Sequence, residues 1–446
     1  LKKLITMQYT RNELDFKRGT FRAKGDIVEI YPSDQSESAV RVEFWGDEIE
    51  KISEINPVTG KTIGIRKHIL ISPASHYVTT SNKMERAIGT IEQELQERIK
   101  YFKDNGYEVH VASKDQGIEI PYCDKKFDVC FTRSLNIKDI TKSYTTIKKI
   151  LIENDYELIS CHTPFGAASP RLAASKIKNF NSKIVYTAHG FHFYKGAPLI
   201  NWMIYYPMEK YLSRYTDSII TINDEDYNTA KKKMKSKIYK VHGIGISREK
   251  FDIKVSASEK MKLRKELNIV NDNFVLIFPG EINNNKNQIL LLDTIKILKE
   301  KIPNIVLLLP GYDLLQGKLQ KYAKQNGLYD NVRFLGYRKD IPQLLRISNM
   351  AVSSSKREGL PINIIESMYV GLPIVATNCR GNRDLIKDGK NGYLVDSYKA
   401  DEFAQKIEKI YENKKKAEKF IQTNKEEVNK YMLDSVLTEI IKIYER

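Results

Sequence analysis

The chain has 446 residues, enough for two or three domains, and a formal net charge of +17. A basic balance of this size is typical of proteins that meet nucleic acid, an anionic membrane surface or a phosphate-rich substrate. The four cysteines show no C-x2-C pairing, which argues against a zinc site or a disulfide framework, and no apolar run is long enough to span a bilayer. Without a signal peptide, the chain is expected in the cytoplasm, and its lack of an initiator Met favours a fragment.

Residues 1–80 are predicted to form a small antiparallel β domain. Alternating apolar and polar residues at Thr20–Ile30 and Ala39–Trp45, interrupted by glycines and a turn segment at 32–36, indicate its strands. From Gln8 the sequence reads QYTRNELDFKRGTFRAKGDIVEIYPSDQSESAVRVEFWGDEIEKISEINPVTGK. This segment resembles the UvrA-interacting domain of the excision-repair protein UvrB, with the similarity running to about residue 106. The alternative is an ordinary β-rich accessory domain whose charged sheet face is exposed to solvent and binds no partner.

The resemblance to UvrB implies that charged residues on this sheet dock UvrA. The expected docking residues are Arg11, Arg22, Lys24, Arg41 and Glu43. Cations grouped around an acid suit a complementary charged interface. Because the chain has no G-x4-G-K-[ST] sequence, it lacks an ATP-driven motor, so we expect partner binding without direct processing of DNA.

A helix is predicted to join this domain to the rest of the chain. Residues 81–104, SNKMERAIGTIEQELQERIKYFKD, carry apolar side chains at helical spacing, and Asn105-Gly106 is a stop signal. The junction helix is therefore assigned to residues 81–106.

Residues 107–265 show the alternation of strands and helices that is typical of a parallel α/β sheet. Strands are predicted at 107–112, 157–161, 182–187 and 218–222. His162 and His189 directly follow two of these strands, at the sheet edge where ligands bind in such folds. The aromatic and cationic segment Phe191–Tyr215 fits either a helix lying in a membrane interface or a buried domain helix.

A second α/β unit is predicted over residues 266–425. An apolar strand at 273–279 ends at Gly280, and Lys286 follows six residues later. A strand at 304–311 and a helix at 315–325 lead to the loop Gly336–Ile341. Within residues 426–446, the helix Leu433–Tyr444 is expected to cross back to the first unit.

The stretch 356–386, KREGLPINIIESMYVGLPIVATNCRGNRDLI, carries two carboxylates, Glu358 and Glu366, eight residues apart. A tight turn at Gly359–Pro361 and a helix from about Ile362 would leave Glu358 in the preceding loop and Glu366 about one turn inside the helix. The first N–H groups of that helix suit an anion or sugar hydroxyls. The GLPIVAT that follows predicts a short buried strand at 373–377.

The pattern E-x7-E followed by GLPIVAT resembles the retaining, nucleotide-sugar-dependent glycosyltransferases of family four, of the capsular or exopolysaccharide type. The likeness covers residues from about 100 to the end and implies a GT-B architecture, with two facing Rossmann-like domains after the small β domain. It implies transfer from a nucleotide sugar, expected to be a UDP-sugar, to a lipid-linked or saccharide acceptor. The expected transferase needs no metal or cofactor and lies at the inner face of the membrane through peripheral contact.

The resemblance also assigns roles. It gives catalytic roles to His189 and Glu358, and His162 is a weaker candidate on the acceptor side. The expected donor-binding residues are Gly280, Lys286, Tyr337, Arg338, Gly359, Leu360, Pro361, Glu366 and Arg383. Glu281 replaces the family's diphosphate-binding arginine, so Arg357, Arg380 or Arg383 could supply the lost charge.

The join leaves the first Rossmann-like unit short. Such a domain begins with a central strand, yet residues 107–112 resemble the family's second strand, so the native first strand is missing. Residues 69–71 either replace it, between strands 107–112 and 158–162, or stay in the UvrB-like sheet; we prefer the latter because the segment matches its own family. The missing strand could impair activity. The alternatives to a working transferase are a UvrA-binding adaptor with an inert transferase remnant and an accidental fusion of two genes.

Overall fold

The computed structural model describes residues 4, 9–13, 15–32, 38–46, 48–66, 68–69, 71, 96–114, 119–131, 137–253 and 255–446. The chain divides into two compact units, Leu1–Ile91 and Glu92–Arg446. Of the predicted junction helix, residues 96–104 are helical, while residues 81–95 lie outside the described part of the chain.

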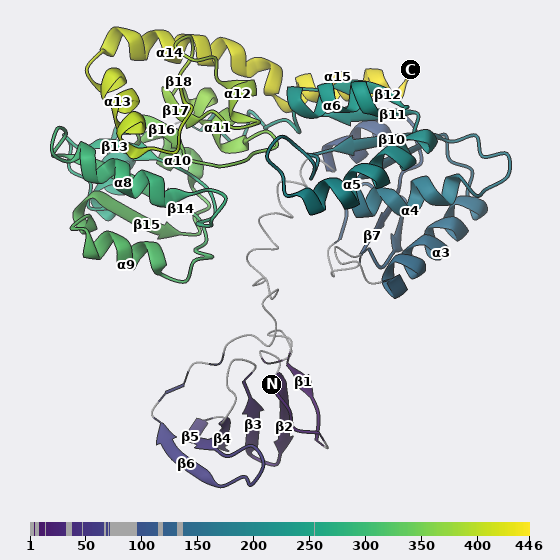
Figure 1. Ribbon diagram of the computed structural model, residues 1–446, viewed down its shortest axis with the longest axis horizontal. Coiled ribbons are helices and arrows are strands. Elements are labelled where there is room, and N and C mark those ends of the chain that lie inside the picture. The colour runs from purple at the N-terminus through teal and green to yellow at the C-terminus, as the bar shows by residue number, and fades with distance from the viewer. Residues whose placement is uncertain are drawn as a thin grey trace. The chain divides into compact units, whose positions relative to one another are not determined.

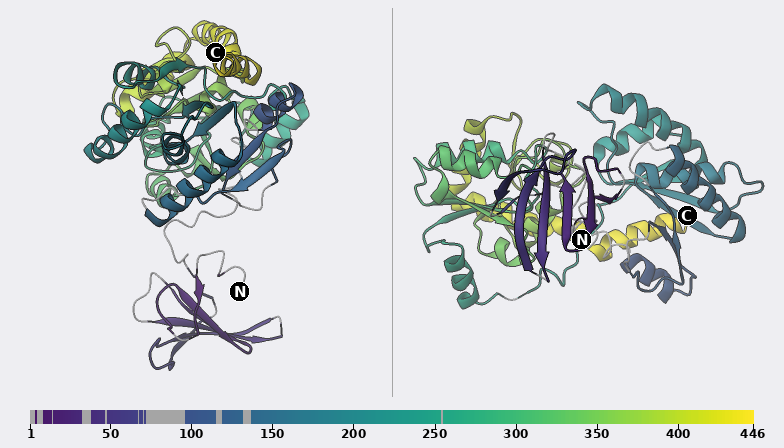
Figure 2. Two further views of the ribbon diagram at one scale, coloured as in Figure 1. Left: turned by 90° about the vertical axis from the view of Figure 1, so that its right-hand side faces the viewer. Right: turned by 90° about the horizontal axis from the view of Figure 1, so that it is seen from below.

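The first unit is built on a six-stranded sheet whose neighbours follow chain order (Figures 1 and 2). Its strands are β1 (Thr10–Arg11), β2 (Thr20–Lys24), β3 (Ile27–Tyr31), β4 (Ala39–Trp45), β5 (Glu48–Ile55) and β6 (Thr62–Arg66). All pairs are antiparallel except β1–β2, which is parallel. The predicted antiparallel β domain is confirmed.

One face of this sheet forms a core because the side chains alternate along each strand. Phe21, Ile30 and Val40 are buried there, and Ile69 and Ile71 pack against them. The idea that residues 69–71 replace the lost Rossmann strand is therefore wrong, since both isoleucines complete the first unit's own core.

The first half of the second unit, residues 96–245, is called the acceptor-side half after the role expected for it, and it contains two separate parallel sheets. Strands β7 (His110–Ser113) and β8 (Lys125–Asp128) form one pair. Strands β9 (Leu158–His162), β10 (Lys183–Ala188), β11 (Ser218–Thr221) and β12 (Lys237–Lys240) form the other, in the order β12-β11-β10-β9. Within the described ranges no strand is hydrogen-bonded between β7 and β9, as the prediction of a missing first strand requires.

Helices cover both faces of the four-stranded sheet. On one face lie α4 (Pro164–Ala174), α5 (Leu199–Leu212) and α6 (Asp224–Lys233), which bury Tyr186, Phe193 and Ile219. Helix α3 (Ile137–Glu153) packs beside α4. The Asn223 side chain caps α6 by accepting the Asp226 N–H, and acidic residues in the first turn with lysines in the last complement the helix dipole.

The second half, residues 257–427, is called the donor-side half in the same way and holds a six-stranded parallel sheet in the order β15-β14-β13-β16-β17-β18. Its strands are β13 (Phe274–Ile277), β14 (Ile305–Pro310), β15 (Val332–Gly336), β16 (Met350–Ser353), β17 (Ile374–Thr377) and β18 (Tyr393–Val395). These strands read as continuous apolar runs because both faces are covered. This is the doubly wound order, in which ligands bind beyond the carboxyl ends of the strands.

Two helical layers cover the donor-side sheet. One layer comprises α8 (Gln288–Leu298), α9 (Lys318–Gln325) and α13 (Ala400–Tyr411), and the other comprises α10 (Ile341–Arg346), α11 (Ile362–Val370) and α12 (Asn382–Leu385). Helix α7 (Ala257–Glu266) precedes the sheet in the chain, and α14 (Lys414–Glu427) follows it.

The last helix, α15 (Leu433–Tyr444), crosses back as predicted. It buries Val436, Ile440 and Ile443 against Val185 and Ile220 of the acceptor-side sheet, on the face opposite α4 (Figure 1). The Tyr444 ring stacks on Phe102 at 5.9 Å, and its hydroxyl lies 2.6 Å from Ser160 Oγ. This helix therefore supplies part of the first Rossmann-like domain's core.

Candidate functional site

The two carboxylates of the 356–386 stretch lie as their spacing predicts. Glu358 is in the loop before α11, whose N-cap is Pro361, and Glu366 is the fifth residue of the helix. Gly371 ends α11 with a φ of 85°, a conformation that favours glycine. The following strand, β17, is fully buried, as predicted.

Glu358 forms an ion pair with Lys286, with 2.7 Å between Oε1 and Nζ and side chains only 14% and 19% exposed. The loop before α8 places Lys286: the Asn283 side chain accepts the Lys286 N–H, and Ser354 Oγ donates to the Lys286 carbonyl. Gly280, three residues after the end of β13, lies beside the stem of the Lys286 side chain. The structure therefore joins a cation and a carboxylate at the carboxyl end of the donor-side sheet.

Glu366 has a different cationic neighbour. Its Oε1 lies 3.3 Å from Nζ of Lys250, which comes from the segment that joins the two halves of the second unit. Lys250 was not a predicted site residue. No local pattern marks it, because its position depends on how the connecting segment passes α11.

The GLP turn touches the acceptor-side half through backbone. A Cβ atom placed on Gly359 would lie 2.5 Å from the carbonyl oxygen of His189, closer than real contacts allow. The Leu360 side chain packs closely against Gly243, where an added Cβ would lie 2.6 Å from a Leu360 methyl group. Gly359 is therefore required for the close approach that sets His189 beside the loop of Glu358.

His162 and His189 lie together at adjacent strand ends. Their rings stack at 5.4 Å, and 3.1 Å separates His162 Nδ1 from His189 Nε2. Burial, with a further contribution from the Arg98 guanidinium, lowers the pKa of His189 to about 4 and holds that of His162 well below its ordinary value. Both imidazoles are therefore neutral at pH 7, so one donates a hydrogen bond to the other. Ser160 Oγ, 3.2 Å from His162 Nε2, extends the chain of hydrogen bonds to Tyr444.

Two of the arginines considered for the diphosphate are tied to α6 instead. Arg380 is 6% exposed and donates to Asp226 Oδ1 at 2.8 Å, and it also donates to the carbonyls of Phe191 and Glu358. Arg383 pairs with Glu225 at 2.6 Å. These arginines therefore join the two halves of the second unit through α6. Arg357, in contrast, donates to the hydroxyl of Tyr194.

The predicted base-binding loop is only partly available. Tyr337 stacks on Tyr312 with ring centroids 5.0 Å apart. Arg338 forms a two-pronged pair with Asp340 and a third contact with Glu266, and these hydrogen bonds raise its pKa. The structure therefore brings Gly280, Lys286, Glu358, Gly359 and His189 together, whereas Arg338 pairs with Asp340 and Glu266.

The charged face of the first unit centres on an acid that was not predicted. Glu29, 7% exposed, accepts from Arg22 at 2.5 Å and from Arg41 at 2.6 Å across three strands. Lys24 is exposed on the same face, because the register places it opposite Ile27 and Arg22 opposite Glu29. Glu43 lies 3.9 Å from Lys51, and Arg11 pairs with Glu13 at the sheet edge. The cluster is therefore built around Glu29 rather than Glu43.

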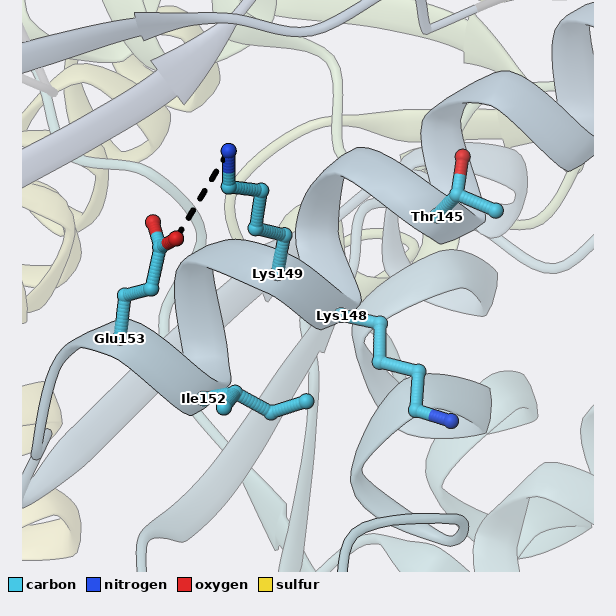
Figure 3. Close-up of a pocket in the computed structure, with 5 residues that line it drawn as sticks. All are labelled: Thr145, Lys148, Lys149, Ile152 and Glu153. Atoms are coloured by element: carbon cyan, nitrogen blue, oxygen red, sulfur yellow. Dashed lines mark ion pairs between the residues drawn. The ribbon is translucent and has the colours of Figure 1, made fainter.

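A further hollow lies on the outside of α3 (Figure 3). Thr145, Lys148, Lys149, Ile152 and Glu153 line it, all from this one helix. A hollow made by a single helix surface has no convergent polar groups from other elements, so it is not the functional site.

In the part of the chain that the structure describes, no helix is both long and apolar enough to cross a bilayer. Among the same residues, no three His, Cys, Asp or Glu side chains are grouped to hold a metal ion.

Three families match parts of this sequence. Residues 259–427 match the family described as glycosyl transferases group 1, and residues 89–223 match glycosyl transferase 4-like proteins. Residues 1–77 match the UvrB interaction domain.

Individual proteins show the same division. Putative glycosyltransferase EpsD of Bacillus subtilis is 39% identical over 348 residues, which are 78% of this chain and 91% of that protein. UvrABC system protein B of Bacillus velezensis is 56% identical over 106 residues, which are 24% of this chain but only 16% of that protein. The crystal structure of Anabaena HepE with UDP has a TM-score of 0.64 at 20% identity, covering 79% of this chain and 95% of that one, and shares the GT-B fold. With EpsD matched over nearly its whole length, the chain belongs to the group 1 glycosyltransferases and carries a UvrB interaction domain in front of the transferase.

Proposed function

We propose that this glycosyltransferase moves a sugar from a UDP-sugar to a lipid-linked saccharide with retention of the anomeric configuration. The observation that carries the proposal is the Lys286–Glu358 pair, set at the start of α11 beside the backbone of His189. A cation, a carboxylate, free helix N–H groups and a neutral imidazole are the groups that a diphosphate-linked sugar needs.

Each group has a proposed role at the donor. Lys286 and the α11 N-terminus take the diphosphate, because both attract an anion. Glu358 accepts hydrogen bonds from the sugar hydroxyls, and Glu366 accepts those of the ribose. Crystal structures of HepE, which has the same fold, hold UDP and UDP-glucose, and this supports uracil as the base of the donor.

The proposed reaction needs no group beyond these. The acceptor oxygen bonds to the anomeric carbon while the bond from that carbon to the diphosphate oxygen breaks. The departing UDP takes the acceptor's hydroxyl proton on a phosphate oxygen. Lys286 stabilises the charge that develops on this leaving group, which is the usual largest contribution to catalysis. His189 is neutral at pH 7, so it positions the donor sugar by hydrogen bonding rather than by charge.

We expect the acceptor to lie at a membrane that the enzyme contacts peripherally, with His162 on the acceptor side of the cleft. We also expect turnover to be lowered because no described strand is hydrogen-bonded between β7 and β9. The carboxyl ends of the strands on either side of this gap form the acceptor side of the site.

The test is release of nucleoside diphosphate from a panel of nucleotide sugars, with a lipid extract as acceptor. Glu358→Gln should abolish release, while Glu300→Gln, a substitution of an exposed acid after the end of α8, should leave it unchanged. Release that survives Glu358→Gln would refute the assigned role. No release from any donor by a folded sample would instead support the adaptor function below.

A second function is favoured by the charged cluster on the first unit. We propose that the sheet face around Glu29, Arg22, Arg41 and Lys24 binds UvrA, since the chain matches this domain of UvrB over one-sixth of that protein's length. The full chain should capture UvrA in a pull-down. Capture should fail for Arg22→Glu with Arg41→Glu and persist for Arg18→Glu, which changes an exposed turn. No capture by the unmodified chain would rule this function out.

A further inference from the structure

Helix α5 presents an apolar face to solvent. Leu199 is 81% exposed, Met203 72% and Ile200 56%, and these positions share one side of the helix. The opposite side, with Trp202, Tyr205 and Tyr206, packs into the acceptor-side core. Most aromatic side chains of the 191–215 segment are thus at least partly buried, with Phe191 and Phe193 in the core, whereas the exposed side chains of the first turns of α5 are aliphatic. Large apolar side chains grouped on a surface mark an interaction site.

The exposed face of α5 carries no carboxylate. The only acid of the helix, Glu209, is buried, where it accepts from Arg171 at 2.8 Å and from the Tyr186 hydroxyl at 3.0 Å. Toward the C-terminal end of α5 the outward positions become basic and aromatic, with Lys210, Tyr211 and Arg214 all exposed.

A second group of cations borders the same face. Lys231, Lys232 and Lys233 end α6, and all three are exposed. Lys233 and Lys210 each lie 5.7 Å from the ring of Tyr206, so the end of α6 lies against the middle of α5. The acids of α6 lie at its other end, where Asp224 pairs with Lys240, Glu225 with Arg383 and Asp226 with Arg380.

We propose that the exposed face of α5, with the lysines that end α6, docks on an anionic lipid surface. The apolar side chains insert at the headgroup boundary and the cations pair with lipid phosphates, the arrangement of an interfacial helix. A second copy of this chain would bring the same cations face to face, so repulsion disfavours it as the occupant. No helix of the described residues is long and apolar enough to cross the bilayer, which suits surface contact.

The docking surface adjoins the candidate site. His192, in the loop that leads into α5, stacks on Tyr205 at 4.5 Å, and Tyr194 of the same loop contacts Arg357 and Arg380. A lipid that enters along α5 would present its sugar near His162 and His189. This consequence for the acceptor rests on the proposed function, whereas lipid binding itself does not.

Co-sedimentation of the full chain with vesicles tests the proposal. Binding should require phosphatidylglycerol in phosphatidylcholine vesicles and should weaken as salt rises. Leu199→Glu with Met203→Glu should reduce vesicle binding by at least about tenfold, because two anions replace apolar contacts. Met261→Glu with Val270→Glu is the matched control, since it places the same charges on exposed apolar residues of the donor-side half and should bind like the unmodified chain.

Three results would overturn the inference: no binding to anionic vesicles, equal binding to neutral vesicles, or an equal loss in both double variants. The far-ultraviolet circular dichroism spectrum and the urea-unfolding midpoint should be the same in all samples, which shows that each variant is folded. If vesicle binding follows the expected pattern but no nucleotide sugar is turned over, the docking surface stands and the proposed transfer fails.

Discussion

Replacing Arg380 with Met should lower the free energy of unfolding of the second unit far more than replacing Arg383 with Met. Arg380 and Asp226 are 6% and 1% exposed, and the contact of 2.8 Å joins the donor-side loop after β17 to the first turn of α6. Arg380→Met keeps most of the side-chain volume and deletes the charge, leaving the Asp226 carboxylate buried without its cation.

Breaking a buried ion pair by removing one partner costs about 3–5 kcal/mol. Asp226 keeps two hydrogen bonds, from Asn223 Nδ2 and from the Phe191 N–H, so we expect the lower end, about 3 kcal/mol. Arg383→Met is the control: its pair with Glu225 is 44% exposed on the arginine side, and exposed pairs contribute only about 0–1 kcal/mol.

The stability lost in Arg380→Met should also depend on pH. Burial raises the pKa of Asp226 above its ordinary 3.8, and Arg380 opposes that rise. Without Arg380 the pKa of the folded state rises further. Because a raised carboxyl pKa favours folding only while the group is protonated, the deficit of Arg380→Met should be smallest at acid pH and grow as pH rises above 3.8.

The chain itself supplies the assay, since it has two tryptophans. In a Trp45→Phe background, Trp202 of α5 reports urea unfolding of the acceptor-side half. Adding Asp226→Asn to Arg380→Met should restore most of the lost free energy of unfolding. The reasoning is refuted if Arg380→Met costs no more than Arg383→Met, or if Asp226→Asn deepens the loss.

Three further expectations follow from other contacts. Arg171→Met should lower the free energy of unfolding by about 3–5 kcal/mol in the same Trp202 assay, because it strands the buried Glu209, and Glu209→Gln should recover part of the loss. Gly359→Ala should cost about 1–3 kcal/mol and depress nucleotide-sugar turnover, because its Cβ would collide with the His189 carbonyl; unchanged turnover would contradict the close approach. Because the pKa of His189 is lowered from 6.5 to about 4, its neutral form stabilises the folded state by up to about 3 kcal/mol above pH 6.5, and this contribution is lost as pH falls toward 4. In urea titrations, the free energy of unfolding of His189→Asn should therefore depend less on pH between 4 and 6.5 than that of the unmodified chain.

Local signals predicted much of this molecule. The bounds of α15 and the start of α11 follow from apolar spacing and from the Gly-Leu-Pro turn, and the strands of the first unit follow from alternation. Each of these patterns is formed by residues that are close together in the sequence, so these elements can be predicted without knowing how the chain packs.

Contacts that depend on register or on packing between distant elements could not be predicted. Glu29 meets Arg22 and Arg41 only because three strands align in one register. Arg380 and Asp226 are 154 positions apart, and Lys250 meets Glu366 across 116. Composition alone also left two interpretations of the 191–215 segment open, because it cannot tell which face of α5 is buried.

The crossing of α15 has a consequence for how this protein is made. On the ribosome, the acceptor-side strands emerge before the entire donor-side sheet, yet Val185 and Ile220 are covered by side chains of α15, which is synthesised after it. One face of that earlier sheet therefore stays uncovered during translation of roughly two hundred residues, on the order of ten to forty seconds at ordinary elongation rates. The first Rossmann-like domain to be translated is thus the last to be finished, and chaperones would meet it with its apolar face open.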